Sequence, residues 1–252
     1  MSLPVAFVEK MPDKKPGNKR IHARIVEGLG SEICGGGLLP GDKLPGDLEL
    51  NARFDASRTA VREALKVLSS KGLIEARQRA GTFVRPRSDW DLLDSEVLSW
   101  LSHKTIGEGL YEDILELREI IEPAAAGFAA RRATDQDFRA IEEAFRRMEN
   151  STDDLEAWYT ADADFHLSVL RACHNQILVR FAGIVQTILS VTLDLQKEVE
   201  IDVSVGMPAH REVFECIRDR DRRGAERAMR ATIARGRKTL RDRFGKRARS
   251  TT

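Results

Sequence analysis

Two histidines and one aspartate lie on the apolar faces of two predicted helices. Asp162 and His166 are four residues apart, so both side chains lie on one side of a helix predicted over residues 153–174. His210 begins the apolar stripe of a second predicted helix, over residues 207–220. A carboxylate on a buried face is costly unless a partner charge, a metal ion or a water-filled pocket compensates it. The three residues are therefore candidate ligands of one divalent metal ion.

Two other interpretations of these residues stay open from the pattern alone. A histidine on an apolar face is often a hydrogen-bonded core residue. Two histidines and one carboxylate also hold metal ions in oxygenases and hydrolases, so a metal-dependent enzyme is an alternative function. No general base or nucleophile stands out near the three residues, which favours a binding function over an enzyme.

A stretch near the N-terminus predicts secondary-structure elements in the order found in domains that bind double-stranded DNA. Ser57 is a good N-cap, and the apolar spacing that follows predicts a helix over residues 58–70 that ends before a glycine. Two short runs, 73–77 and 82–85, then predict a β-hairpin with a basic tip. An isolated row of charges on a helix is usually only solvated. Helix and hairpin in this order instead indicate a winged helix-turn-helix, with the helix in the major groove.

The charge of the chain is divided between its two parts. Residues 1–87 carry 16 Lys and Arg against 10 Asp and Glu, whereas residues 88–234 carry 17 against 29. Only the first part has the electrostatic footprint of a nucleic-acid-binding domain. The tail from Arg235 carries eight Lys and Arg and one Asp, and we interpret it as a frayed helix end with a cationic extension.

Bulk composition predicts a cytoplasmic protein without a membrane span. Hydrophobic residues make up 42% and charged residues 32% of the chain, which is ordinary for a helix-rich globular protein. Cys34, Cys173 and Cys216 are scattered without paired or metal-type spacing, as expected in a reducing compartment. No apolar run reaches about 18 residues, and no basic segment precedes the short apolar start, so neither a membrane span nor a secretory signal is predicted.

The periodicity along the chain predicts a mainly α fold, with an N-terminal winged helix-turn-helix followed by an all-α antiparallel helical bundle. Helices of the second part are expected over residues 108–131, 134–150, 153–174, 176–199, 207–220 and 221–244. Pro123 is expected to kink or restart the first of them. The predicted domains are a flexible arm (1–18), the DNA-binding domain (19–86), a linker and linking helix (87–106), an effector-binding and dimerisation domain (107–245) and a basic tail (246–252).

Several motifs at fixed spacing in the first part resemble the DNA-binding domain of the GntR family of bacterial transcription regulators. They lie at residues 41–45, 48–54, 57–65, 72–74 and 81–84. The resemblance implies that the recognition helix and the wing contact an operator, through Ser57, Arg58, Thr59, Arg62, Lys66, Arg79 and Gly81. Two positions depart from the family pattern. Leu48 stands where many members carry a basic residue, and Asp55 stands where glycine is usual.

The helical part resembles the FCD ligand-binding domain of the FadR-type branch of that family. The matching residues are Glu116-Leu117-Arg118, Glu122-Pro123, 129–134, 162–166, Asn175, His210 and Gly224-Ala225. Members with this Asp-x-x-x-His and a later His bind a divalent metal there, which implies a metal at Asp162, His166 and His210. Zinc is the first expectation, with nickel, manganese or iron as alternatives. Many members add a fourth His about 22 residues further on, where this chain has Thr232.

The same resemblance implies a small carboxylate effector. A carboxylate with hydroxyl groups would chelate the metal and meet a fork-shaped guanidinium. The candidate effector-binding residues are Arg118, Asn175 and Thr232, although Arg118 has the alternative of an i,i+4 salt bridge to Glu122. Residues 90–100 resemble the branch that responds to sugar acids such as galactonate or gluconate.

We therefore expect a homodimeric repressor, rather than an enzyme, that binds a palindromic operator and responds to a sugar acid. The two-His-one-carboxylate enzyme remains one alternative. The other is a constitutive DNA-binding protein whose C-terminal domain only dimerises.

Overall fold

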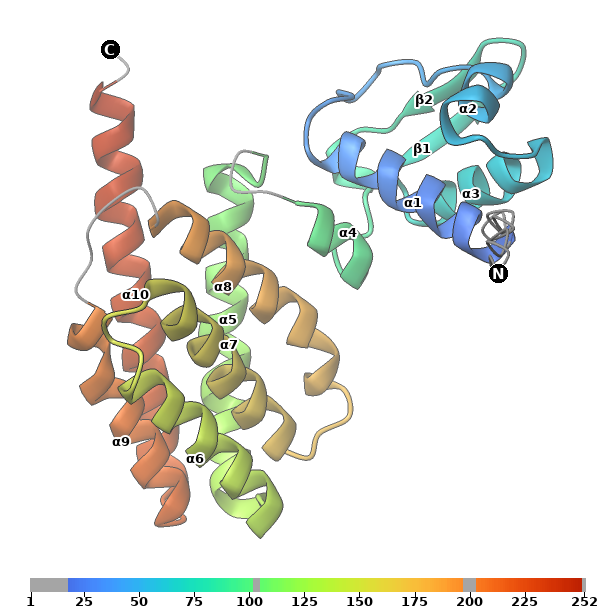
Figure 1. Ribbon diagram of the computed structural model, residues 1–252. Coiled ribbons are helices and arrows are strands. Elements are labelled where there is room, and N and C mark those ends of the chain that lie inside the picture. Colours follow the sequence, from blue (N-terminus) through green and yellow to red (C-terminus); the bar gives the residue numbers. More distant parts are fainter. Residues whose placement is uncertain (1–17, 102–104, 197–202, 251–252) are drawn as a thin grey trace, which may run out of the picture. The chain divides into compact units, whose positions relative to one another are not determined.

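The computed structural model describes residues 18–101, 105–196 and 203–250, and the chain forms two compact units (Figure 1). One unit reaches to Trp90 and the other begins at Asp91, while Cys34–Gly37 group with the second. The predicted N-terminal arm lies outside the described residues except for Asn18, which begins the first helix.

The first unit consists of three helices and a two-stranded wing, as predicted. Its elements are α1 (Asn18–Cys34), α2 (Asp47–Phe54), α3 (Arg58–Ser70), β1 (Ile74–Arg77) and β2 (Gly81–Val84). The strands pair antiparallel, with Ile74 opposite Val84 and Arg77 opposite Gly81. The fully buried side chains of the unit include Ile25, Leu29, Ile33, Leu50, Leu68, Leu73 and Ile74. Such a small domain buries nearly all of its apolar faces to be stable.

The ends of the short helices are set by their capping residues. The Oγ of Ser57 accepts a hydrogen bond from the Ala60 N–H at 3.2 Å, which makes Ser57 the N-cap of α3. Asp55, the C-cap of α2, has φ 45° and ψ 54°, the left-handed conformation that favours glycine.

A short helix follows the first unit. The 3₁₀ turn η1 (Arg87–Asp89) lies at the end of the first unit, and α4 (Ser95–Trp100) comes after it. The Asp94 carboxylate accepts from the backbone N–H groups of Glu96 and Val97, which makes Asp94 the N-cap of α4.

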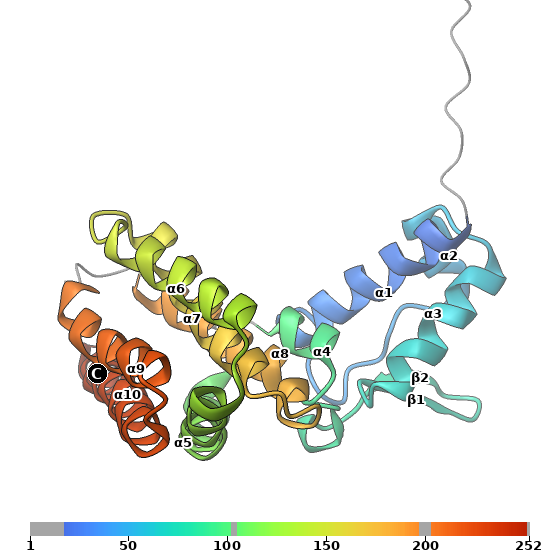
Figure 2. The same cartoon turned by 90° about the horizontal axis from the view of Figure 1, so that it is seen from below.

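The second unit is an antiparallel helical bundle, shown from two directions in Figures 1 and 2. Its helices are α5 (Gly107–Arg132), α6 (Asp135–Glu149), α7 (Leu155–Ala172), α8 (Ala182–Gln196), α9 (Met207–Arg218) and α10 (Arg222–Ser250), with 3₁₀ turns η2 (Leu178–Phe181) and η3 (Val203–Gly206). The helix α10 packs on α5 and α9, and α7 packs on α6 and α8. Within the described ranges, no helix has the length and apolar content to cross a membrane.

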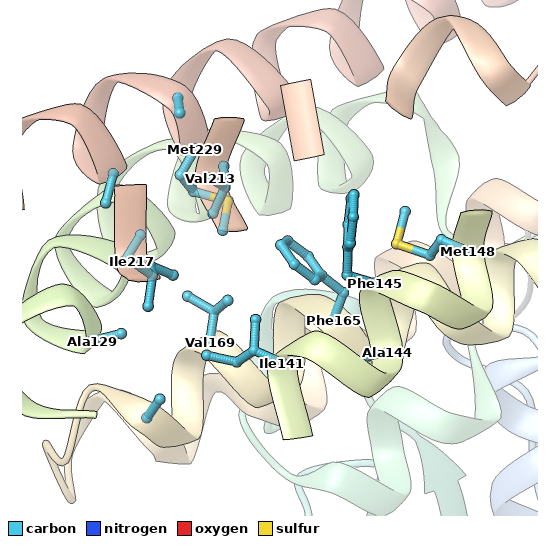
Figure 3. Packing of buried hydrophobic residues seen from close by; sticks show 14 of the residues in the cluster. Ala129, Ile141, Ala144, Phe145, Met148, Phe165, Val169, Val213, Ile217 and Met229 are labelled. Atoms are coloured by element: carbon cyan, nitrogen blue, oxygen red, sulfur yellow. The ribbon is translucent and has the colours of Figure 1, made fainter. Parts of the chain in front are cut away.

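The core of the bundle lies between α5, α6, α7, α9 and α10 (Figure 3). Phe145 stacks on Phe214 with ring centroids 5.0 Å apart, and it also meets Phe165 at 6.2 Å. Phe165 is fully buried and immediately precedes His166 in α7. The aromatic packing therefore holds α7 and α9 together next to the predicted metal ligands.

Three element boundaries differ from the sequence prediction. The helix α5 runs through Pro123 without restarting. The carbonyl of Glu119, which loses its helical partner because proline has no N–H, instead accepts from Nη1 of Arg230 on α10 at 3.5 Å. The helix α8 begins at Ala182 rather than 176, because η2 occupies the intervening residues; the predicted end at 199 lies outside the described residues. The helix α10 continues to Ser250 and takes in most of the predicted basic tail.

Candidate metal centre and DNA-binding surface

The structure brings the three predicted metal ligands together. Asp162 and His166 come from α7 and His210 from α9, and all three are buried. One ligand atom from each lies within 4.8 Å of the others. Oδ1 of Asp162 is 2.9 Å from Nε2 of His210 and 3.6 Å from Nε2 of His166.

The outer nitrogens of both histidines have acceptors as partners. Nδ1 of His210 lies 3.0 Å from the carbonyl oxygen of Gly206, and Nδ1 of His166 lies 2.5 Å from Oε2 of Glu122. Because a carbonyl or carboxylate oxygen only accepts, each Nδ1 carries the hydrogen in these contacts. In the neutral rings, each Nε2 therefore presents a lone pair towards Asp162.

The inner atoms of the cluster fit a bound cation. Nε2 of His210 is buried and has no hydrogen-bond partner among the described residues, although it lies 2.9 Å from Oδ1 of Asp162. Burial opposes ionisation of Asp162, but His166 and His210 in their protonated forms, together with Arg118, outweigh it and lower the pKa of its carboxyl. A bound cation would take the place of these protons. A carboxylate oxygen and two imidazole lone pairs thus converge on one point. This donor set suits zinc and the other first-row divalent metals.

Glu122 is a residue of the site that sequence reasoning assigned only to a salt bridge. It is 2% exposed, and its carboxylate accepts from Arg118 as well as from His166. Burial would raise the pKa of Glu122, but Arg118 and His166 lower it to about 2. A carboxylate that fixes a ligand histidine in this way is a common outer-shell partner at metal centres. The sequence feature that could have indicated Glu122 is its position one helical turn after Arg118, which was a candidate effector-binding residue.

Arg118 lies beside the metal cluster and forms an ion pair with Glu122. This pair is the alternative to effector binding that the sequence indicated for Arg118. It is 5% exposed, and Nε and Nη2 donate to the two carboxylate oxygens of Glu122. Its Nη1 makes no hydrogen bond within the described residues. A role for Arg118 in effector binding therefore stays a prediction, with part of the guanidinium already bound.

The other two predicted effector residues lie in different surroundings. Thr232 is buried on α10, and its hydroxyl donates to the Ala228 carbonyl at 2.9 Å. Asn175 lies in the α7–α8 connection, where its Oδ1 accepts from the N–H groups of Ile177 and Leu178. Asn175 also lines a cavity of about 820 Å³ whose lining includes none of the metal ligands. The roles of both residues in effector binding stay predictions.

The predicted recognition helix, α3, presents its basic residues to solvent. Arg58, Thr59, Arg62 and Lys66 are all exposed on α3. Lys66 pairs with Glu63 at 2.7 Å, and Arg62 approaches Asp47 at 3.5 Å. Exposed pairs of this kind are weak, so both cations can exchange their partners for phosphates. The Oγ of Ser57 accepts the capping hydrogen bond from the Ala60 N–H, a contact that does not use the O–H of Ser57 as a donor.

The wing carries two residues in the left-handed region. Arg79 has φ 60° and is exposed, and Gly81 has φ 115°. A Cβ at Gly81 would lie 2.7 Å from Cε of Lys43, whose backbone bridges to Phe83. Sequence reasoning did not assign Lys43 to the DNA-binding surface, although it belongs to the 41–45 motif. The structure thus places another cation, Lys43, beside the wing that carries Arg77 and Arg79.

Comparison with known proteins identifies both parts of the chain. Residues 21–84 match the family model described as bacterial regulatory proteins, gntR family, and residues 113–235 match the FCD domain. The galactonate operon transcriptional repressor of Escherichia coli (strain K12) is 34% identical over 220 residues, which is 87% of this chain and 96% of that protein. The HTH-type transcriptional regulator LutR of Bacillus subtilis (strain 168) is 34% identical over 164 residues, covering 64% and 72% of the two chains.

Solved structures share the fold at low sequence identity. The structure of Escherichia coli McbR/YncC aligns with a TM-score of 0.55 at 18% identity, covering 89% of this chain and 98% of that one. The structure of Lar, which controls the expression of the Listeria monocytogenes agr system, aligns with a TM-score of 0.57 at 19% identity, covering 89% and 96%. These two comparisons support the architecture alone.

Proposed function

The chain belongs to the gntR family of bacterial regulatory proteins and carries an FCD domain, and from this premise we propose that it is a repressor released from its operator by a sugar acid. Its function as a DNA-binding transcription regulator with an effector domain follows from the family and its relatives. The alternative of a metal-dependent enzyme is wrong, because the relatives are transcription regulators.

The observation that carries the proposal is the convergence of Oδ1 of Asp162 with Nε2 of His166 and His210 in a buried site. A divalent metal held there would supply a Lewis-acid centre for an anionic oxygen ligand. Three protein ligands leave coordination positions free for the oxygens of a small molecule. Zinc is our first candidate, with nickel, manganese and iron as alternatives.

A carboxylate with neighbouring hydroxyls is the effector chemistry that suits this site. Arg118 adds a positive charge next to the cluster, and part of its guanidinium is free of hydrogen bonds within the described residues. The Escherichia coli relative is named as a galactonate operon repressor, which supports a sugar acid as the effector class. We use galactonate as the first probe.

Two copies of the chain would bind one palindromic operator in the cytoplasm. A dimer places one α3 in each half-site, so the two-fold symmetry of the protein matches that of the DNA. If the effector favours the DNA-incompetent state by about a hundredfold, a coupling free energy of about 2.7 kcal/mol is enough to release the operator.

Selection of binding sites from random duplexes tests the DNA-binding half of the proposal. We expect a palindrome to be enriched by the wild type and not by a variant with Arg58→Ala and Arg62→Ala. Enrichment of the same sequence by both proteins would contradict the assignment of α3 as the recognition helix. Thermal shift with galactonate, before and after removal of metal by a chelator, tests the effector half. If no sugar acid stabilises the metal-loaded protein or alters operator affinity, the C-terminal domain is purely dimerising.

A further inference from the structure

Two buried side chains of the described residues carry a polar atom without a hydrogen-bond partner, and they are neighbours. The atoms are Nε2 of His210 and Nε1 of Trp158, and each of the two residues is only 5% exposed. Their rings meet edge to face, with centroids 6.0 Å apart. Buried polar atoms nearly always have a partner in a folded protein. Two adjacent exceptions therefore indicate a place where groups from outside the chain bind.

The two atoms differ in the kind of group that can satisfy them. Nε2 of a neutral histidine has a lone pair, so the metal proposed above accounts for His210. The indole nitrogen of Trp158 carries a hydrogen and can only donate, so it cannot bind a cation. Its missing partner is an acceptor atom, such as an oxygen of a bound molecule. A metal alone would therefore leave the site incomplete.

Trp158 and the ion pair of Arg118 lie on the two sides of Asp162 along α7. Trp158 comes one helical turn before Asp162, and His166 comes one turn after it. His166 meets Glu122, which in turn holds Arg118. Trp158 and His166 are separated by about 12 Å along the helix axis. A ligand whose carboxylate meets Arg118 must therefore extend past Asp162 to reach the indole of Trp158.

The indole ring is held in a fixed orientation by its neighbours. Tyr159 meets it edge to face at 4.9 Å between centroids, in addition to the contact with His210. A Cβ added at Gly206 would lie 3.8 Å from Cζ2 of Trp158 and 3.9 Å from Nδ1 of His210. Cζ2 is bonded to the ring carbon that carries Nε1. The N–H edge of the indole is therefore near the start of α9, where residue 206 has no side chain to cover it.

We propose that Trp158 determines the specificity of the effector site, by donating its Nε1–H to a hydroxyl oxygen that lies far from the carboxylate of the sugar acid. This inference rests on the effector of the proposed function and names a residue that recognises it. A short hydroxy acid can meet the metal and Arg118 without reaching Trp158. The site thus distinguishes a polyhydroxy acid from a short one, because only the longer ligand satisfies the buried donor.

Calorimetric titration of the zinc-loaded full-length chain with galactonate and with glycolate tests this inference. Trp158→Phe keeps an aromatic ring in the core and removes the N–H. We expect its dissociation constant for galactonate to rise about 10-fold, and that for glycolate to stay within about twofold of the wild type. The affinity for zinc should not change. The matched control is Trp100→Phe, because Trp100 is also 5% exposed but lies on α4, and this variant should bind both ligands as the wild type does.

Nuclear magnetic resonance of the indole N–H groups tests the hydrogen bond in the unmodified protein. The chain has three tryptophans, and the signal of Trp158 is the one that Trp158→Phe removes. A new hydrogen bond from Nε1 should move its proton signal downfield when galactonate is added. Glycolate should leave this signal in place. A tryptophan that only fills the core would not respond differently to the two ligands.

The possible results separate this inference from the proposed function. Loss of galactonate affinity in Trp158→Phe with unchanged zinc affinity, together with the shifted indole signal, supports the inference even where glycolate binds too weakly to measure. Equal losses for both ligands, or a matching loss of zinc affinity, would show that Trp158 only supports the packing of the metal site. Unchanged galactonate affinity would mean that water, not the effector, accepts from Nε1. If the wild type binds no sugar acid, the proposed effector itself fails, and this inference with it.

Discussion

Oε2 of Glu122 lies 2.5 Å from Nδ1 of His166, so a carboxylate on α5 fixes the orientation of a metal-ligand candidate on α7. The same carboxylate binds Arg118, and all three side chains are buried. One buried residue thus connects the predicted metal ligand to the predicted effector-binding arginine.

Substitution Glu122→Gln tests this connection. We expect the affinity for zinc to fall about 10- to 100-fold, because the His166 ring loses the carboxylate that orients it. The free energy of unfolding should also fall by about 3 kcal/mol, since Arg118 is left as a buried charge without its counter-ion. Competition with a chromophoric chelator, well below the melting temperature, measures the affinity. The control is Glu142→Gln, which breaks a pair of the same i,i+4 spacing with Arg146 at the surface. Equal zinc affinity in wild type and Glu122→Gln would exclude the orienting role.

Substitution Thr232→His tests whether residue 232 lies at the position of a fourth metal ligand, which Thr232→Ala would not reveal. The hydroxyl of Thr232 bonds only to its own helix, at Ala228, so its loss breaks no contact between helices. If Thr232 lies at the fourth position of the family site, the added imidazole should raise zinc affinity by at least about tenfold. Isothermal titration with zinc is the measurement, and Ala231→His at the neighbouring exposed position is the control. An unchanged affinity in Thr232→His would place residue 232 outside the metal site.

Arg79 at the wing tip should contribute to DNA binding at a cost in stability. A non-glycine residue at φ 60° is strained, so Arg79→Gly should raise the free energy of unfolding by about 1 kcal/mol. The same variant should bind operator more weakly, and the dependence of its affinity on log salt should be less steep by about one. The control is Asp55→Gly, which relieves a left-handed residue at φ 45° in the same unit without removing a cation. Operator affinity that is unaltered in Arg79→Gly would show that the wing tip does not contact DNA.

The cap of α6 should make the bundle less stable in acid. Burial opposes ionisation of Asp137 and is the largest single effect, but hydrogen bonds from Thr134 and the contact with His174 together outweigh it and lower the pKa of the carboxyl. A lowered folded-state pKa stabilises the fold above the unfolded value near 3.8, and this contribution is lost as the pH falls through the folded-state pKa. We expect Asp137→Asn to cost about 1 kcal/mol at pH 7 and progressively less below pH about 4.

Urea unfolding at neutral and acid pH measures this difference. Asp135→Asn is the matched control, because Asp135 lies in the same first turn of α6 without forming the capping box. A cost of Asp137→Asn that stays constant down to the lowest pH would refute the linkage.

The architecture was accessible from the sequence because local signals agree with the tertiary packing. Ser57 caps the helix that it was predicted to begin, and the four-residue spacing of Asp162 and His166 places both on one face of α7. The third ligand, His210, was found because it shares an apolar stripe with Val213 and Ile217, which are both buried in the core. Periodicity reports such inward faces directly.

Other features depend on contacts between distant segments, which periodicity does not report. The sequence offered Glu122 only as a helical neighbour of Arg118, whereas its bond to His166 joins residues 44 apart in sequence. Pro123 was expected to kink or restart a helix, but a side chain from α10 satisfies the carbonyl that it leaves free. The wing position of Lys43 likewise depends on a bridge to Phe83 across the unit.

The central claim is that a sugar acid at the metal site governs the hold of this regulator on DNA. Fluorescence anisotropy of the selected operator, titrated with galactonate in the presence of zinc, tests it for the wild type and for Asp162→Asn. We predict that galactonate weakens operator binding by the wild type about a hundredfold. Asp162→Asn and the chelator-treated wild type should both stay bound to the operator when galactonate is added. Equal release of both proteins by galactonate, or no effect on either from galactonate and related sugar acids, would contradict the account.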